Sequence, residues 1–155
     1  MKTLREELKK KNPFDMPEQE AYLNIIYTQE KLFEEFTALF KPYGLTPPRY
    51  NVLTILRGVG SKGIKTLAIL EPMINRITDL TRLVDKLVRE RYAERQISKK
   101  DRRVIFVKIT AKGLDVLTKL DKPVLKLHKD QLGHLTRREL SELNRLLSKC
   151  RYPTG

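Results

Sequence analysis

The chain has 155 residues, of which 40% are hydrophobic and 33% are charged, and its formal net charge is +13. This length and apolar content predict one domain with a core of its own, and the single cysteine, Cys150, excludes an internal disulfide and a cysteine-rich zinc site. The chain has no long apolar run and no apolar signal-peptide core behind its charged start, so we expect a cytoplasmic protein without a membrane span.

The first eleven residues predict a short helix or a mobile arm. A long helix is predicted next, over residues 15–40, because Asp15 followed by Glu18 is typical of a capped start. Pro42 and Gly44 are expected to end it. Its apolar positions are Leu23, Ile26, Tyr27, Leu32, Phe33, Phe36 and Phe40.

A second helix is expected from Thr46, which would cap it, because prolines follow at the first helical positions. Residues 58–63 then form a turn and residues 65–71 a short helix before Pro72. Residues 77–88 predict an amphipathic helix with a polar, basic face, capped by Asn75 or Thr78. Its apolar side carries Ile77, Leu80, Val84, Leu87 and Val88, and its polar side carries Thr78, Arg82, Asp85, Lys86 and Arg89.

Two short strands follow, at residues 92–97 and 104–109, joined by a charged turn over residues 98–103. From Arg82 to Lys112 the chain carries eleven Lys or Arg against four Asp or Glu. This order of helix, strand, cationic turn and strand is the layout of a winged helix-turn-helix. Residues 1–48 are near neutral, with seven basic and eight acidic side chains, whereas the rest holds 25 basic and 11 acidic ones. A polyanionic partner is therefore expected, with a merely soluble basic protein as the alternative.

Two helices are predicted to close the chain. Thr110 caps the first, which Pro123 is expected to kink, and Thr136 with Glu139 forms the capping box of the second. The leucine stripes of these two helices are larger than a small DNA-binding domain can bury. We therefore expect a second copy of the chain to cover them. The alternative is that these helices wrap their own domain.

The predicted fold is therefore mainly α with a small β-hairpin wing: a winged helix-turn-helix flanked by N- and C-terminal dimerisation helices. We expect a single domain over residues 1–155, with the DNA-binding part at about 46–110 and dimerisation helices at about 15–43 and 110–150.

Three groups of residues resemble the MarR family of bacterial winged-helix transcriptional regulators. Gly44-Leu45-Thr46 with Tyr50, Val52 and Leu53 resembles the family's entry to its second helix, and residues 80–87 resemble the centre of its recognition helix. Asp101-Arg102-Arg103 with Val107, Ile109-Thr110 and Gly113 resembles its wing and long dimerisation helix. The resemblance covers residues 18–149. The chain departs from the family pattern in having about two more residues between Leu67-Ala68 and Thr81-Arg82, and in Pro72, which interrupts a regular helix-turn-helix.

The pattern places Thr78, Thr81, Arg82 and Lys86 in the major groove, with Arg82 on a guanine edge or on phosphate. Asp79 either caps the helix or accepts a hydrogen bond from a cytosine amino group. The resemblance implies that Arg103 enters the minor groove, steadied by Asp101. We expect three further basic residues to contact the DNA backbone, and a surface hairpin with solvated charges is the alternative. They are Lys99, Lys100 and Arg102.

The resemblance also implies a small phenolic or lipophilic effector. Four aromatic residues are candidates to line its cleft, although aromatic residues at helical spacing more often belong to a core. They are Tyr27, Phe40, Tyr43 and Tyr50. The first helix lacks the cysteine through which some members sense oxidants, and Cys150 is expected to be a packed or incidental thiol.

We expect no enzyme, cofactor or metal, because no catalytic motif is present and His128 and His134 are six residues apart, unlike a metal-binding pair one helical turn apart. The predicted function is that of a homodimeric, sequence-specific regulator of transcription, a repressor that reads a palindromic operator in double-stranded DNA. The alternative is an RNA- or ribosome-associated basic protein that uses the same winged helix.

Overall fold

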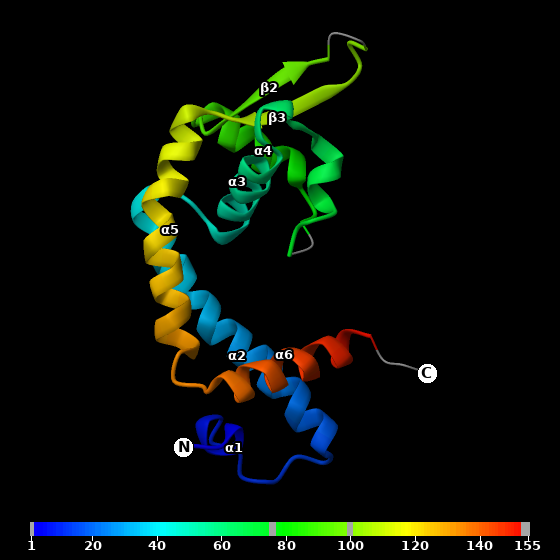
Figure 1. Cartoon of the computed structure of the whole chain (residues 1–155). Helices are drawn as coiled ribbons and strands as arrows, with labels where there is room; N and C mark the ends of the chain where they lie inside the picture. Colours follow the sequence, from blue (N-terminus) through cyan, green and yellow to red (C-terminus); the bar gives the residue numbers. More distant parts are fainter. Residues whose placement is uncertain (1, 75–76, 99–100, 153–155) are drawn as a thin grey trace. The chain divides into compact units, whose positions relative to one another are not determined.

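The computed structural model describes residues 2–74, 77–98 and 101–152 (Figure 1). The chain divides into two compact units, Met1–Pro47 and Pro48–Gly155. The single domain expected over residues 1–155, with its DNA-binding part and its dimerisation helices, stays a prediction. No helix among the described residues is long and apolar enough to cross a bilayer.

The first unit is helical. It contains α1 (Leu4–Glu7), α2 (Pro17–Phe40) and the 3₁₀ turn η1 (Lys41–Tyr43). A short helix among the first eleven residues is confirmed by α1, in which Thr3 forms a capping box with Glu6.

The predicted start of the long helix is wrong, because α2 begins at Pro17 with Met16 as its cap residue and no side-chain cap. Proline has no amide hydrogen and its φ is already helical, so Pro17 starts a helix without the carboxylate cap that Asp15 was expected to supply. The Asp15 amide instead donates to the side chain of Gln19 over 3.0 Å. The predicted end is confirmed: α2 stops at Phe40, and Gly44 adopts the left-handed conformation at φ 65°.

The second unit contains the winged helix-turn-helix. Its elements are α3 (Pro47–Val59), the 3₁₀ turn η2 (Gly60–Lys62), β1 (Ile64–Lys65), the 3₁₀ turn η3 (Thr66–Leu70), α4 (Leu80–Arg89), β2 (Ala93–Ile97), β3 (Ile105–Ile109), α5 (Ala111–Leu132) and α6 (Arg137–Arg151). Figure 1 shows β2 and β3 as a hairpin, and α5 leads away from it towards α6. The predicted fold class, mainly α with a small β-hairpin wing, is confirmed.

The sheet has three antiparallel strands in the order β1-β3-β2. Ala93 pairs with Ile109 and Ile97 with Ile105, so the two predicted strands pair as an antiparallel hairpin, and each begins one residue later than predicted. The third strand, β1, was not expected from the sequence, because two residues carry no alternating pattern. The short helix predicted over residues 65–71 is the 3₁₀ turn η3.

The core of this unit is apolar and continuous from the helices to the sheet. Its residues that are at most 5% exposed include Val52, Leu53, Leu56, Ile69, Leu80, Val84, Leu87, Ala93, Val107 and Leu117. The two terminal caps are confirmed: Thr110 accepts a hydrogen bond from the Gly113 amide, and Thr136 forms the capping box with Glu139. Pro123 lies inside α5, which continues beyond it to Leu132.

Candidate nucleic-acid interface

Helix α4 buries one face and exposes the other. Leu80, Val84 and Leu87 recur at helical spacing and are at most 5% exposed, which anchors the helix in the core. Of the predicted polar side, Thr78 precedes the helix, whereas its other four residues lie on the helix and are exposed, as is Thr81. The exposed polar face of α4 therefore consists of Thr81, Arg82, Asp85, Lys86 and Arg89. This face is short, polar and rich in cations, as an element that enters a DNA groove has to be.

The start of α4 differs from the prediction. The helix begins at Leu80 and not at Ile77, and its cap is Asp79, whose carboxylate accepts a hydrogen bond from the Arg82 amide over 2.9 Å. Of the two expected roles for Asp79, the structure forms the cap. Of the two predicted cap residues, Asn75 lies outside the described residues, and Thr78 is exposed but precedes the helix. The prediction began the helix at Ile77 because that residue fits the apolar spacing of the helix. In the structure the Asp79 carboxylate caps the first turn, so the helix begins at Leu80.

The end of α4 is fixed by hydrogen bonds. Arg91 adopts a left-handed conformation at φ 62°, its amide donates to Val88, and the Tyr92 amide donates to Leu87. This is the pattern of a Schellman motif, with arginine at the position that usually holds glycine. Next to it, the carboxylate of Glu90 accepts two hydrogen bonds from the buried guanidinium of Arg49 on α3, at 3.2 and 3.3 Å.

The tip of the hairpin is held by Asp101. Its carboxylate accepts a hydrogen bond from the backbone amide of Arg103 over 2.9 Å, and the Val104 amide donates to the Asp101 carbonyl. Asp101 therefore shapes the turn by holding the backbone of Arg103 and not its guanidinium, and the side chains of Arg102 and Arg103 are exposed. The predicted phosphate contacts Lys99 and Lys100 lie outside the described residues.

The hairpin and α4 are joined by an ion pair that was not predicted from the sequence. Nη2 of Arg95 on β2 lies 2.6 Å from Oδ1 of Asp85 on α4. Because Asp85 belongs to the polar face of α4, this pair shows that the face borders the first strand of the hairpin. The available signal was that Asp85 is the single carboxylate within the Leu80–Arg89 helix.

The end of α4 and the start of α5 are also tied together. The Thr110 hydroxyl donates to the Arg91 carbonyl over 2.7 Å, and the Lys112 ammonium donates to the Glu90 carbonyl over 2.9 Å. The Lys112 ammonium also lies 4.5 Å from the ring centre of Tyr92, within the range of a cation–π contact. This junction holds the recognition helix in a defined position relative to α5.

The four candidate ligand-lining aromatics are divided between the two units. Tyr27, Phe40 and Tyr43 belong to the first unit, and Tyr50 belongs to α3 in the second. Phe40 is 1% exposed and its ring centre lies 5.8 Å from that of Phe36, as expected of a core residue. Burial raises the pKa of the Tyr50 hydroxyl; the positive charge of Arg57 opposes this rise, and the negative charge of Asp121 adds to it.

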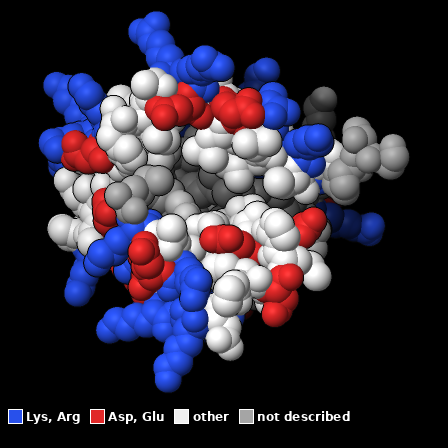
Figure 2. Space-filling model, turned by 90° about the horizontal axis from the view of Figure 1, so that it is seen from below, with Lys and Arg blue, Asp and Glu red and all other residues white. Residues whose placement is uncertain are grey.

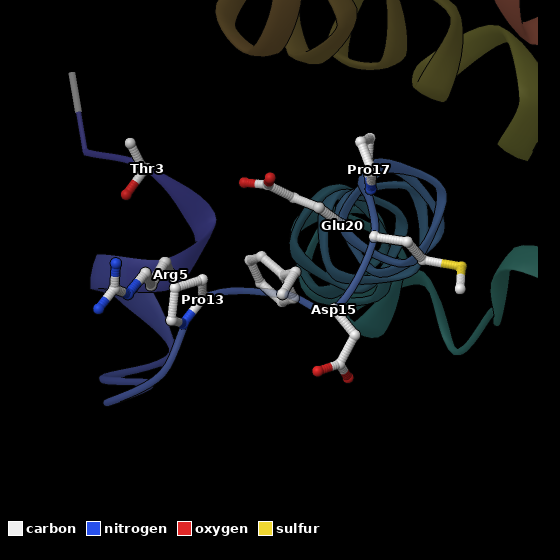
Figure 3. A pocket seen from close by; sticks show the side chains of 8 residues that line it. Thr3, Arg5, Pro13, Asp15, Pro17 and Glu20 are labelled. Atoms are coloured by element: carbon white, nitrogen blue, oxygen red, sulfur yellow. The ribbon is translucent and has the colours of Figure 1, made fainter.

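A hollow of about 400 Å³ lies elsewhere, between α1 and the start of α2 (Figure 3). Its lining includes Arg5, Phe14, Asp15 and Glu20 and none of the four candidate aromatics. The guanidinium of Arg5 donates to the carbonyls of Lys10 and Lys11, so it stabilises the turn that shapes this hollow.

Charge on the surface is mixed. Figure 2 shows Lys and Arg side chains projecting around the edge of one face, with Asp and Glu interspersed and uncharged atoms between them. Basic residues nevertheless outnumber acidic ones by 32 to 19, so the molecule as a whole attracts polyanions. Within the described residues no cluster of three or more His, Cys, Asp or Glu side chains could hold a metal ion.

The sequence of the chain is similar to those of known transcriptional regulators. The sequence model of the transcriptional regulator SarA/Rot family matches residues 31–120. The chain is 27% identical to the transcriptional repressor MprA of Escherichia coli over 145 residues, which cover 85% of this chain and 82% of that protein.

Two solved structures extend the similarity. A MarR transcription factor from Planctomyces limnophilus is 37% identical, with a TM-score of 0.68, 88% of this chain covered and 98% of that one. A MarR variant from Escherichia coli, solved in complex with operator DNA, is 25% identical with a TM-score of 0.73, covering 81% of this chain and 89% of that one.

Proposed function

Because the chain belongs to the transcriptional regulators of the MarR and SarA/Rot type, we propose that it is a homodimeric repressor that binds a palindromic operator in double-stranded DNA. The observation that carries this proposal is the exposed polar face of α4 beside a hairpin with an arginine-rich tip. One element has the dimensions of a major-groove reader, and the other can reach the adjacent minor groove.

We assign the recognition roles as follows. Thr81, Arg82 and Lys86 read or flank base edges in the major groove, because all three are exposed on the α4 face. Thr78 is exposed and precedes the helix, so we assign it to the edge of the groove. Arg103 enters the minor groove, and the Asp101 carboxylate prepares it by accepting a hydrogen bond from the backbone amide of Arg103, which holds that residue's backbone in place.

We further assign the backbone contacts to the remaining wing cations. Arg102 is exposed next to the Asp101-stabilised turn, and Lys99 and Lys100 precede it in the sequence. Such contacts position a protein on DNA without reading its sequence, and each one increases the salt dependence of binding.

The leucines of α6 support the dimer. No residue of α6 is buried, and Leu143 and Leu146 are 38% and 45% exposed although they share one apolar side with Leu140 and Leu147. On α5, Leu125 is 68% exposed. An amphipathic helix of this kind needs an apolar partner, and a second copy with twofold symmetry would also supply the second half-site reader.

Sedimentation of the protein at micromolar concentration tests the dimer, with an expected mass of twice 18.2 kDa. The double variant Leu143→Glu with Leu146→Glu should shift that mass towards the monomer. The double variant Glu142→Gln with Arg145→Gln, which changes an exposed ion pair on the same helix, serves as the control. A monomeric parent protein would contradict the two-half-site mechanism.

Binding assays test the kind of partner. Affinity for a selected palindromic duplex should exceed that for a scrambled duplex or a structured RNA by about 10³-fold or more at near-physiological salt. Equal binding to all three would favour the alternative, an RNA- or ribosome-associated protein. Release by a small lipophilic ligand remains a prediction from the family resemblance.

A further inference from the structure

The ion pair between Asp85 and Arg95 connects the two elements to which DNA recognition is assigned. Arg95 Nη2 and Asp85 Oδ1 lie 2.6 Å apart, and the two side chains are 36% and 47% exposed. Among the ion pairs of the described residues, this is the one that joins α4 to the hairpin.

The position of Arg95 on the strand explains why it reaches α4. Side chains alternate along a strand, so Ala93, Arg95 and Ile97 share one face of β2. Ala93 is 2% exposed, and Arg95 pairs in register with Val107, which is fully buried. Arg95 therefore starts from the same side of the hairpin as the buried Ala93, and from there its guanidinium reaches Asp85.

The position of Asp85 is unusual for a groove-facing helix. It lies one turn after Arg82 and one turn before Arg89, next to Lys86, and is the single carboxylate of the α4 helix. A carboxylate at this place repels phosphate, so it lowers the affinity of the face for any DNA. Its contact with Arg95 gives this carboxylate a role in the arrangement of the two reading elements.

We propose that Asp85 is a positioning residue that, through Arg95, holds the base of the hairpin against the recognition helix and sets the distance between them. This inference rests on the proposed function. Simultaneous reading of a major groove and the neighbouring minor groove requires that distance to match the DNA. A random duplex makes no such demand, because phosphate contacts tolerate small displacements.

The pair is expected to affect specificity much more than folding. Ion pairs with this much solvent exposure contribute little to stability, and α4 keeps its apolar anchors and its Asp79 cap without it. Arginine suits the role because its planar guanidinium fixes direction as well as distance.

The test measures the ratio of operator affinity to random-duplex affinity over a salt series, for the full-length protein. Asp85→Asn should lower this ratio roughly tenfold, with random-duplex affinity unchanged or increased because a negative charge is removed. Asp85→Glu, which keeps the charge and a carboxylate within reach, should retain most of the ratio. Thermal melting should show that all variants remain folded.

A matched control and a double-mutant cycle complete the design. Asp115→Asn removes an exposed carboxylate that pairs with Lys119 on α5 over 2.7 Å, so it changes the net charge equally and should leave the ratio unaltered. Arg95→Gln should lower the ratio as Asp85→Asn does, and the double variant should lose no more than either single one.

The outcomes separate this inference from the proposed function. If the parent protein shows no preference for any duplex, the proposed function fails. If the parent is selective and Asp85→Asn is equally selective, the positioning role is wrong. A loss confined to Arg95→Gln would also overturn it, because Arg95 would then act by contacting DNA directly.

Discussion

Gly113→Ala tests the junction between the recognition helix and α5. Alanine is favoured over glycine within a helix by about 1 kcal/mol, so propensity alone predicts stabilisation. However, a Cβ atom at this position would lie 2.3 Å from the Tyr92 carbonyl oxygen, a backbone atom that cannot move aside alone. Relieving that overlap moves the segment whose carbonyls accept from Thr110, at 2.7 and 3.1 Å.

The magnitude follows from these competing terms. Overpacking costs about 1–3 kcal/mol, and weakening two hydrogen bonds costs about 1 kcal/mol each, against the gain of about 1 kcal/mol. The net expectation is a destabilisation of about 2–4 kcal/mol, or a melting temperature lower by roughly 5–15 °C. Operator affinity should fall as well, because the junction orients the recognition helix.

Gly58→Ala is the matched control. Gly58 is also helical, within α3, and a Cβ atom there would meet nothing within 4 Å. The same chemical change should therefore stabilise the protein slightly, by up to about 1 kcal/mol. Thermal and urea denaturation measure both variants. If the two substitutions had the same sign, steric contact with Tyr92 would not be what requires glycine at position 113.

Three further substitutions or titrations probe other parts of the structure. Arg103→Ala should weaken operator binding by about 1–3 kcal/mol in a salt-series titration. Asp101→Ala should weaken it no more than this, and the effects of the two substitutions should be less than additive. If Arg103→Ala bound the operator as tightly as the parent protein, Arg103 would not act in the minor groove. Gly63→Ala should destabilise more than Gly60→Ala, because both have φ 69° but only at Gly63 would a Cβ meet a neighbour, Lys108 Cγ at 2.7 Å; equal urea midpoints would contradict this. The pKa of Glu139 lies below its ordinary value because the amide and the hydroxyl of Thr136 donate hydrogen bonds to its carboxylate. The cap should therefore stabilise the folded protein at pH values above the ordinary carboxyl pKa, and this contribution should be lost as the pH falls through the lowered pKa. An NMR titration that gave Glu139 an ordinary pKa would show that the capping box does not form.

Much of the fold was predictable because its signals are local. The capping residues Thr110 and Thr136 indicate where the last two helices begin, and the β-branched and aromatic residues at 105–109 indicate a strand. The errors lie where a local signal has competitors. Asp15 and Glu18 match a capping pattern, yet Pro17 supplies a start that needs no cap.

Long-range features were not predictable in the same way. The two-residue strand β1 exists because β3 offers it hydrogen bonds, with Ile64 opposite Val107. The contacts of Asp85 with Arg95 and of Arg49 with Glu90 depend on how helices and strands pack, which one sequence does not state. The sequence does identify the exposed face of α4, because exposure there follows from helical spacing.

Selection of bound sequences from a pool of random duplex DNA tests whether the protein is a homodimeric, operator-reading regulator. We expect enrichment of one palindromic site whose half-sites are about one helical turn apart, bound by two copies of the chain. Recovery of no common sequence, or of a single asymmetric half-site bound by one copy, would contradict a homodimeric operator-reading regulator.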